Sequence, residues 1–230
     1  MAKHIRADSR IQNLNYSTSW QHLSEKERNY AYYMSKASWE GALITLHQMC
    51  YEAPALFCIF QAYFADKNFD DLQNRALMNG VTEEEWANFI AYAGGFYGNM
   101  SNYHSFGAMK FIPDLPEAVF WNILSTHPKA NQEGSDMLYA LQTFRSKVEK
   151  EVYAYDAPYT QLNFPQEGGV TAYFSRSMTK EDLELTKEFL QSAEAVAKGL
   201  DILNTRVFKK SDSEFLLTVG SISEENNCNM

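Results

Sequence analysis

Helical periodicity dominates the first two thirds of this chain and limits what it can fold into. Ser24-x-x-Glu27 and Thr82-x-x-Glu85 are capping boxes, in which each side chain satisfies a free amide of the other residue at a helix start. Apolar residues at three-and-four spacing predict helices over residues 25–48, 54–65, 70–79, 82–97, 114–127 and 136–152. In the first helix we expect a core face made of Tyr30, Tyr33, Met34, Ala37, Gly41, Ile44 and His47 or Gln48. The sequence therefore predicts a helical subdomain at residues 21–155, after an extended lead-in at residues 1–20.

The pattern changes at residue 156, where Pro158, Pro165 and paired glycines break the chain. A strand is predicted at Gly169–Ser175, and Thr179-x-x-Asp182 caps one helix that ends near Gly199. Residues 204–209 and 214–219 read as a hairpin. Two or three strands leave sheet edges open, so residues 156–219 form a mixed α/β segment with an incomplete sheet. We expect an α+β, mainly α-helical fold, with a disordered tail at residues 220–230.

The composition limits the partners of the chain. A formal net charge of −9 argues against nucleic acid or an anionic membrane and suits cationic peptides. No apolar stretch follows the first ten residues, so no secretory signal is expected. The three cysteines have no disulfide-scaffold spacing, which favours a reducing compartment. Together these features predict a cytoplasmic protein.

Catalytic and metal motifs are missing from the sequence. His47, Cys50 and Cys58 could suggest a metal site, but a structural zinc needs four ligands and the fourth is not evident. Buried cysteines with a hydrogen-bonded histidine are the alternative reading. There is no Gly-x-Ser-x-Gly elbow, phosphate loop or dinucleotide fingerprint. We therefore assign no catalytic residue, no metal ligand and no cofactor to this chain.

The stretch from Gly94 to Pro113 follows a predicted helix but has neither a helical nor a strand period. It combines glycines, asparagines, serines and aromatics, which is typical of an ordered loop. The aromatics of such a loop either anchor it in the core or line a pocket. Residue types alone favour the anchor.

The same loop resembles the N-terminal part of the dipeptidyl peptidase III family. The resemblance rests on Asn99–Gly107 and Lys110–Pro113, and it continues at Glu27–Tyr32, Ala37–Trp39, Thr82–Glu85, Gly169–Ser175 and Leu203–Lys209. It implies that the chain forms part of the non-zinc lobe of a two-lobed cytosolic zinc exopeptidase, which releases dipeptides from the amino end of short peptides. Family members are far longer, and their zinc site lies beyond the last residue of this chain.

The resemblance also implies which loop residues meet a substrate. Phe106 would line the pocket for the amino-terminal residues of the peptide, and Asn102, Tyr103 and Ser105 would be its neighbours. Ala108 departs from the family, which usually has an acidic residue there.

The zinc motif of that family has two histidines five positions apart on one helix, with a glutamate beside the first. The histidines of this chain, none of which form such a pair, are His4, His22, His47, His104 and His127. The isolated chain is therefore expected to be inactive, with short peptides and the missing zinc lobe as partners. The alternatives are a non-catalytic peptide-binding or interaction module, and a helical scaffold without a ligand of its own.

Overall fold

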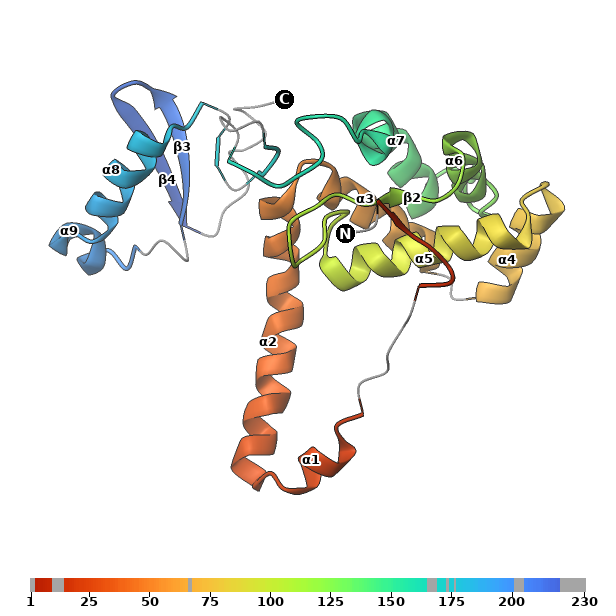
Figure 1. Ribbon diagram of the computed structural model, residues 1–230, viewed down its shortest axis with the longest axis horizontal. Helices are drawn as coiled ribbons and strands as arrows, with labels where there is room; N and C mark the ends of the chain where they lie inside the picture. The colour runs from red at the N-terminus through yellow and green to blue at the C-terminus, as the bar shows by residue number, and fades with distance from the viewer. Residues whose placement is uncertain are drawn as a thin grey trace.

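The structure, a computed structural model, describes residues 3–9, 15–65, 68–164, 169–172, 174–175, 177–200 and 205–219. It is mainly helical, and Figure 1 shows a helical body with one long helix, α2, projecting from it. The elements in chain order are β1 (His4–Ile5), α1 (Ser17–Gln21), α2 (Glu25–Met49), α3 (Glu52–Phe64), α4 (Phe69–Met78), α5 (Glu83–Asn99), β2 (Ile112–Pro113), α6 (Glu117–Ser125), α7 (Asp136–Tyr153), α8 (Lys180–Leu190), α9 (Ala193–Ala197), β3 (Thr205–Ser211) and β4 (Glu214–Val219). In the part of the chain described, no helix is both long and apolar enough to cross a membrane.

Local capping sets the helix starts where the sequence predicts them. Both predicted capping boxes form, at Ser24 for α2 and at Thr82 for α5. Gly80, at φ 86°, ends the turn after α4 in the left-handed region that glycine adopts without strain. The predicted boundaries of α3 to α7 agree with the structure to within a few residues.

The core lies between α3, α5, α6 and α7 and is rich in aromatic rings. Phe60 on α3 is fully buried, and its ring centroid lies 5.4 Å from that of Phe96 and 6.3 Å from that of Phe120. Such edge-to-face pairs add to the burial of apolar area. This core holds the N-terminal end of α3 and the C-terminal end of α5 in fixed positions, and the candidate site described below is built on both.

The predicted core face of α2 is wrong. Tyr30, Tyr33, Met34 and Ile44 are exposed, and Leu46 is the buried residue of this helix. The period of the apolar residues is helical, as predicted, but most of α2 projects away from the helical body (Figure 1). The lead-in also has more structure than expected, because it contains β1, which pairs in parallel with β2, and the short helix α1.

The C-terminal part contains the predicted hairpin, β3 paired with β4. The strand predicted at Gly169–Ser175 is not found among the described residues of that range, where Phe174 makes an isolated bridge to Val207. The single helix predicted up to Gly199 is two helices, because the Ser192 side chain accepts a hydrogen bond from the Ala195 amide and starts α9. The predicted disordered tail, residues 220–230, lies outside the described residues.

Asp182 joins α8 to the hairpin. Its carboxylate accepts from the Thr179 amide at 2.9 Å and from Lys209 Nζ on β3 at 2.9 Å. The Thr179 amide, followed by the Lys209 ammonium, lowers the pKa of the Asp182 carboxyl, because each donates to its charged form. This ion pair links two segments that are separated in the sequence.

Candidate functional site

The loop after α5 folds into a tight turn. α5 ends at Asn99 and is capped by Met100, which has φ 54°. The His104 amide donates to the Met109 carbonyl at 2.9 Å, and the Ala108 amide donates back to the His104 carbonyl at 3.1 Å. Gly107 and Ala108 have φ values of 88° and 52°, which lets the backbone reverse. Alanine adopts this region less readily than asparagine or aspartate, so Ala108 is a position where an acidic residue would fit the backbone well.

Backbone hydrogen bonds hold both sides of this turn. The Phe111 amide donates to the Asn102 carbonyl at 2.9 Å and closes the base of the loop. The Lys110 amide donates to the Thr160 carbonyl at 3.0 Å, and the Leu162 amide donates to the Ala108 carbonyl at 2.9 Å. The turn is therefore fixed between its own base and the segment that follows α7.

A buried ion pair lies beneath the turn. Lys110 is fully buried and Glu52, at the start of α3, is 3% exposed, with 3.2 Å between Nζ and Oε1. Asn102 Nδ2 donates to the same Glu52 oxygen at 3.2 Å, and Cys50 Sγ lies 3.4 Å from Asn102 Oδ1. Lys110 Nζ also donates to the backbone carbonyl of Glu151 on α7. Each buried charge therefore has several polar partners, as a stable buried pair requires.

Aromatic rings and burial complete the support of the loop. The Tyr103 hydroxyl donates to the Tyr159 carbonyl at 2.8 Å, and Lys110 Nζ lies 5.5 Å and 5.4 Å from the centroids of these two rings. Burial raises the pKa of the Tyr103 hydroxyl, and the Glu52 carboxylate raises it further. Burial likewise raises the pKa of the Cys50 thiol, again with Glu52 adding to the effect. Both groups stay neutral near pH 7, so neither is an activated nucleophile.

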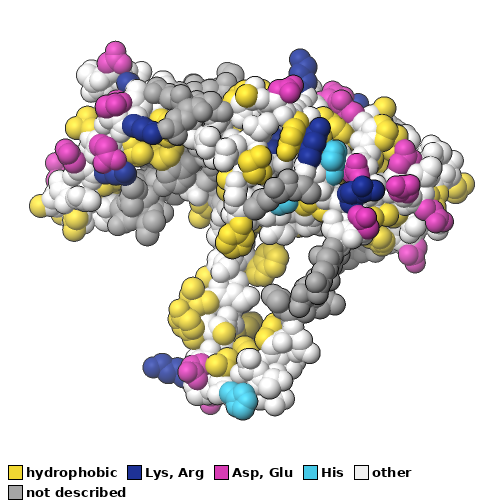
Figure 2. Space-filling view, viewed as in Figure 1, with side chains coloured by type: hydrophobic (Ala, Val, Ile, Leu, Met, Phe, Trp, Pro, Cys, Tyr) yellow, Lys and Arg dark blue, Asp and Glu magenta, His cyan; other side chains and the backbone are white. Residues whose placement is uncertain are grey.

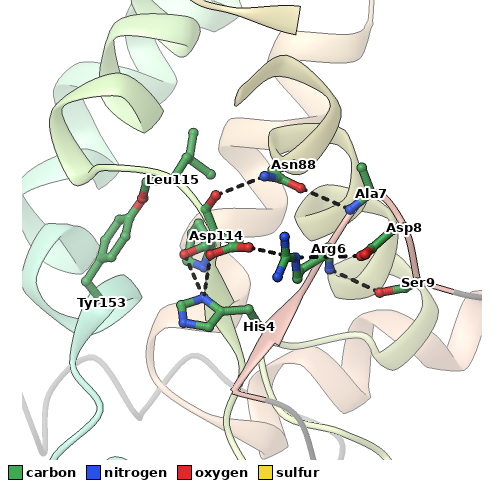
Figure 3. Close-up of polar contacts among 10 residues, drawn as sticks. His4, Arg6, Ala7, Asp8, Ser9, Asn88, Asp114, Leu115 and Tyr153 are labelled. Carbon is green, nitrogen blue, oxygen red and sulfur yellow. Dashed lines mark hydrogen bonds and ion pairs between the residues drawn. The ribbon is translucent and has the colours of Figure 1, made fainter. Parts of the chain in front are cut away.

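The N-terminal segment fixes the other end of the loop (Figure 3). His4 Nδ1 lies 3.2 Å from the Pro113 carbonyl oxygen and 3.6 Å from the Asp114 carboxylate, which also pairs with Arg6 Nε at 3.1 Å. Asn88 on α5 donates to the Asp114 carbonyl and accepts from the Ala7 amide, so one side chain joins both segments to α5. These contacts hold the chain where it leaves the loop through β2.

The four residues singled out from the sequence occupy two levels of this site. Asn102 and Tyr103 are fully buried and belong to the support, whereas Ser105 and Phe106 are exposed at the turn. Phe106 is 85% exposed, and the Ser105 amide donates to Asn99 Oδ1 at 2.8 Å. The structure therefore brings Ser105 and Phe106 to the tip of the turn. Asn102 and Tyr103 are buried beneath it, where they cannot touch a ligand.

Sequence reasoning did not identify Glu52 as part of the site. The signal was a carboxylate at the start of an otherwise apolar helix, together with a lysine, Lys110, in an aromatic-rich loop. Glu52 and Glu151 also line a cavity of about 290 Å³ beside the ion pair, between α3, α7 and residues 169–171. Within the described residues, no group of three His, Cys, Asp or Glu side chains could hold a metal ion, so this part of the chain does not fit a zinc site.

Comparison of the chain with models of protein families first indicates its class of protein. Residues 144–230 match the model of Peptidase family M49. The chain is 37% identical over 205 residues to Dipeptidyl peptidase 3 of Nematostella vectensis, covering 88% of this chain and 27% of that protein. It is 35% identical to Dipeptidyl peptidase 3 of Homo sapiens, over 90% of this chain and 27% of that protein, and 32% identical to the protein of the same name from Dictyostelium discoideum, over 93% and 28%.

The chain belongs to the dipeptidyl peptidase 3 family. It spans about a quarter of the length of these relatives, between 27% and 28% of each.

Proposed function

We propose that this chain supplies part of one wall of a peptide-binding cleft in a dipeptidyl peptidase 3-type exopeptidase. The single observation that carries the proposal is Phe106, which is 85% exposed at the tip of a turn that is held at its base and against the segment that follows α7. A turn does not need to be held by so many hydrogen bonds merely to leave an aromatic ring exposed to solvent. Held in place, it can meet an apolar peptide side chain without a large loss of conformational entropy.

The two levels of the site have separate tasks. Phe106 contacts the amino-terminal residues of a short peptide, and Ser105 lies beside it. Asn102 and Tyr103 act as positioning residues, through their bonds to Glu52 and to the Tyr159 carbonyl. The net charge of −9 favours the approach of cationic peptides.

Hydrolysis is assigned to residues that this chain does not contain. Its five histidines include no pair with the spacing of the zinc motif of the family. No catalytic step is therefore assigned to this chain, and zinc and the zinc lobe belong to the longer proteins of the family. A cytoplasmic location is part of the same proposal.

Peptide titration tests the proposal. The purified chain is titrated with a short cationic peptide and with an anionic peptide of the same length, by calorimetry at low and at high salt. We expect saturable binding that is tighter for the cationic peptide and weakens with salt, because screening reduces long-range attraction. Absence of binding to either peptide would count against the proposed cleft wall.

A second assay tests the division of labour. The chain is supplied with zinc and a dipeptidyl-arylamide, and we expect neither stoichiometric zinc binding nor release of the arylamine. Stoichiometric zinc together with release of the arylamine would show that the chain holds its own catalytic site.

A further inference from the structure

The cavity beside the buried Glu52–Lys110 pair has charged groups at several depths. Its volume is about 290 Å³, which is at the small end for pockets that hold small molecules. Its wall comes from the start of α3, one side of α7, and residues 158–159 and 169–171. Among the charged lining residues, Glu52 is buried, Glu151 is half-buried and Lys147 is exposed. The cavity therefore runs from an exposed rim to a buried carboxylate.

Hydrogen bonds hold the loop segments of this wall in place. The Tyr159 carbonyl accepts from the Tyr103 hydroxyl at 2.8 Å. The Thr171 hydroxyl donates to the Gln48 carbonyl, at the end of α2, at 3.2 Å. A ligand that enters the cavity does not need to order these segments, which lowers the entropic cost of binding.

Two opposite charges of α7 line the cavity without forming an ion pair. Lys147 and Glu151 are four residues apart, so they lie on the same side of the helix. Arg145 and Glu149 have the same spacing and do form an ion pair, with 3.0 Å between Nη2 and Oε1. Among the residues that the structure describes, no ion pair joins Lys147 to Glu151 or either of them to a third side chain. One ammonium and one carboxylate are therefore available to a ligand.

The charge balance of the cavity selects the ligand. Lys110 compensates the charge of Glu52, which leaves Lys147 and Glu151 with a sum of zero. Lys147 would repel a ligand that is only cationic, and Glu151 would repel one that is only anionic. A ligand that carries both an ammonium and a carboxylate has a partner for each charge.

The net charge of −9 does not change this local balance. On the face drawn in Figure 2, acidic side chains gather over α4 and over α8, at the two ends of the molecule. Salt screens exposed charges that are far from a ligand, whereas charges in direct contact with it are screened much less. The groups that line the cavity therefore decide which ligand it accepts.

We propose that this cavity binds a small zwitterion, an α-amino acid or a dipeptide, with its ammonium at Glu151 and its carboxylate at Lys147. The Cβ atoms of residues four apart on a helix lie about 5–6 Å from each other, and two extended residues span about 7 Å, so ligands of this size reach both charges. Tyr51, Tyr159 and Val170 supply aromatic and apolar surface for the side chain of the ligand. This site is separate from Phe106, and the inference does not rest on the proposed function.

Calorimetric titration of the whole chain with leucine and with glycyl-leucine tests the proposal. Each ligand is compared with its C-terminal amide, which lacks the carboxylate, and with its N-acetyl derivative, which lacks the ammonium. We expect saturable binding of a zwitterion and affinities at least about 10-fold lower for its two derivatives, because each derivative loses one charge-assisted hydrogen bond. The tighter of the two zwitterions decides between an amino acid and a dipeptide.

Variants on α7 assign each charge of the ligand to one residue. Lys147→Met should remove the difference between the zwitterion and its amide, and Glu151→Gln should remove the difference between the zwitterion and its N-acetyl derivative. A merely structural role of either residue would not produce this pattern. Glu151→Gln also keeps the backbone carbonyl that accepts from Lys110, so the support of the loop remains.

Matched controls make the same changes on α7 at residues that do not line the cavity. They are Lys150→Met and Glu149→Gln, and both should leave the affinity for the zwitterion unchanged.

Three results would overturn the proposal. They are absence of saturable binding of both zwitterions, an amide or N-acetyl derivative that binds as tightly as its zwitterion, or equal weakening by the control variants. Phe106→Ala should leave the binding of the zwitterion unchanged, so failure of this proposal and failure of the proposed function are distinguishable.

Discussion

Replacing Lys110 by methionine tests whether the buried ion pair with Glu52 holds the loop in place. The two side chains are 0% and 3% exposed, so water does not screen their interaction. Removing one partner leaves an uncompensated buried carboxylate, which costs about 3–5 kcal/mol. The Glu151 carbonyl also loses its donor, at about 1 kcal/mol. Because whole domains are stable by about 5–15 kcal/mol, this single change should remove a large part of the stability.

A second variant distinguishes the charge from the packing. Lys110→Met combined with Glu52→Gln removes both charges and keeps an acceptor for Asn102 Nδ2. The double variant should be less destabilised than the sum of the two single variants by at least about 2 kcal/mol. An exposed control is Lys187→Met, whose partner Glu184 is 67% exposed, and that change should cost less than about 1 kcal/mol.

Urea unfolding followed by tryptophan fluorescence measures these differences, since Trp86 and Trp121 are each 3% exposed in the core. If Lys110→Met cost no more than Lys187→Met, the ion pair would not support the loop. Strictly additive single variants would likewise refute the coupling between the two charges.

Three further predictions follow from individual contacts. Gly94→Ala should stabilise α5 by roughly 0.5–1 kcal/mol in urea unfolding, because the added Cβ would meet nothing within 4 Å. Gly95→Ala should not show this gain, because its Cβ would lie 2.3 Å from the Ile5 side chain of β1. An equal gain at both positions would contradict the docking of β1 on α5. The pKa of Asp182 is lowered in the folded state, so this carboxylate stabilises the fold above its unfolded pKa, and the stabilisation is lost as the pH falls through the folded pKa. In thermal melts followed by circular dichroism, acidification should therefore lower the stability of the wild type more than that of Asp182→Asn. Equal losses of stability would refute the assignment. Iodoacetamide should modify the exposed Cys58 in the native protein, but the buried Cys50 only after unfolding, as peptide mass mapping can determine. Labelling of Cys50 in the native protein would show that the buried cluster beneath the loop opens.

Local signals explain how much of the fold could be predicted from the sequence. The capping boxes at Ser24 and Thr82 involve residues three positions apart, so their geometry is contained in the sequence itself. The hairpin of β3 and β4 is local in the same sense. These elements were predicted correctly for that reason.

Long-range partners explain what the sequence could not reveal. The apolar period of α2 shows a face but not what covers it, and the predicted core face is exposed at Tyr30 and Tyr33. The strand expected at Gly169–Ser175 depends on a neighbouring strand to pair with, and a sequence pattern does not supply one.

The site divides in the same way. Glu52 and Lys110 are distant in the sequence, and only the folded chain brings them together. Residue types favoured aromatic anchors in the loop, and Tyr103 and Phe111 are indeed buried anchors, whereas Phe106 is exposed. The two alternatives for the loop, aromatics that anchor it in the core and aromatics that line a pocket, thus apply to different residues within it.

Phe106→Ala provides the most direct test of the central claim, that a rigidly held turn presents this ring to peptides. Met78→Ala is the matched control, because Met78 is 87% exposed on α4 and away from the loop. We predict that both variants keep their stability to within about 0.5 kcal/mol, as is usual at exposed positions. Only Phe106→Ala should weaken peptide binding in calorimetric titration, by about 10-fold if one aromatic contact of about 1.4 kcal/mol is lost. Unchanged peptide affinity, or a loss of stability without a loss of affinity, would contradict the account and leave the loop with a purely structural role.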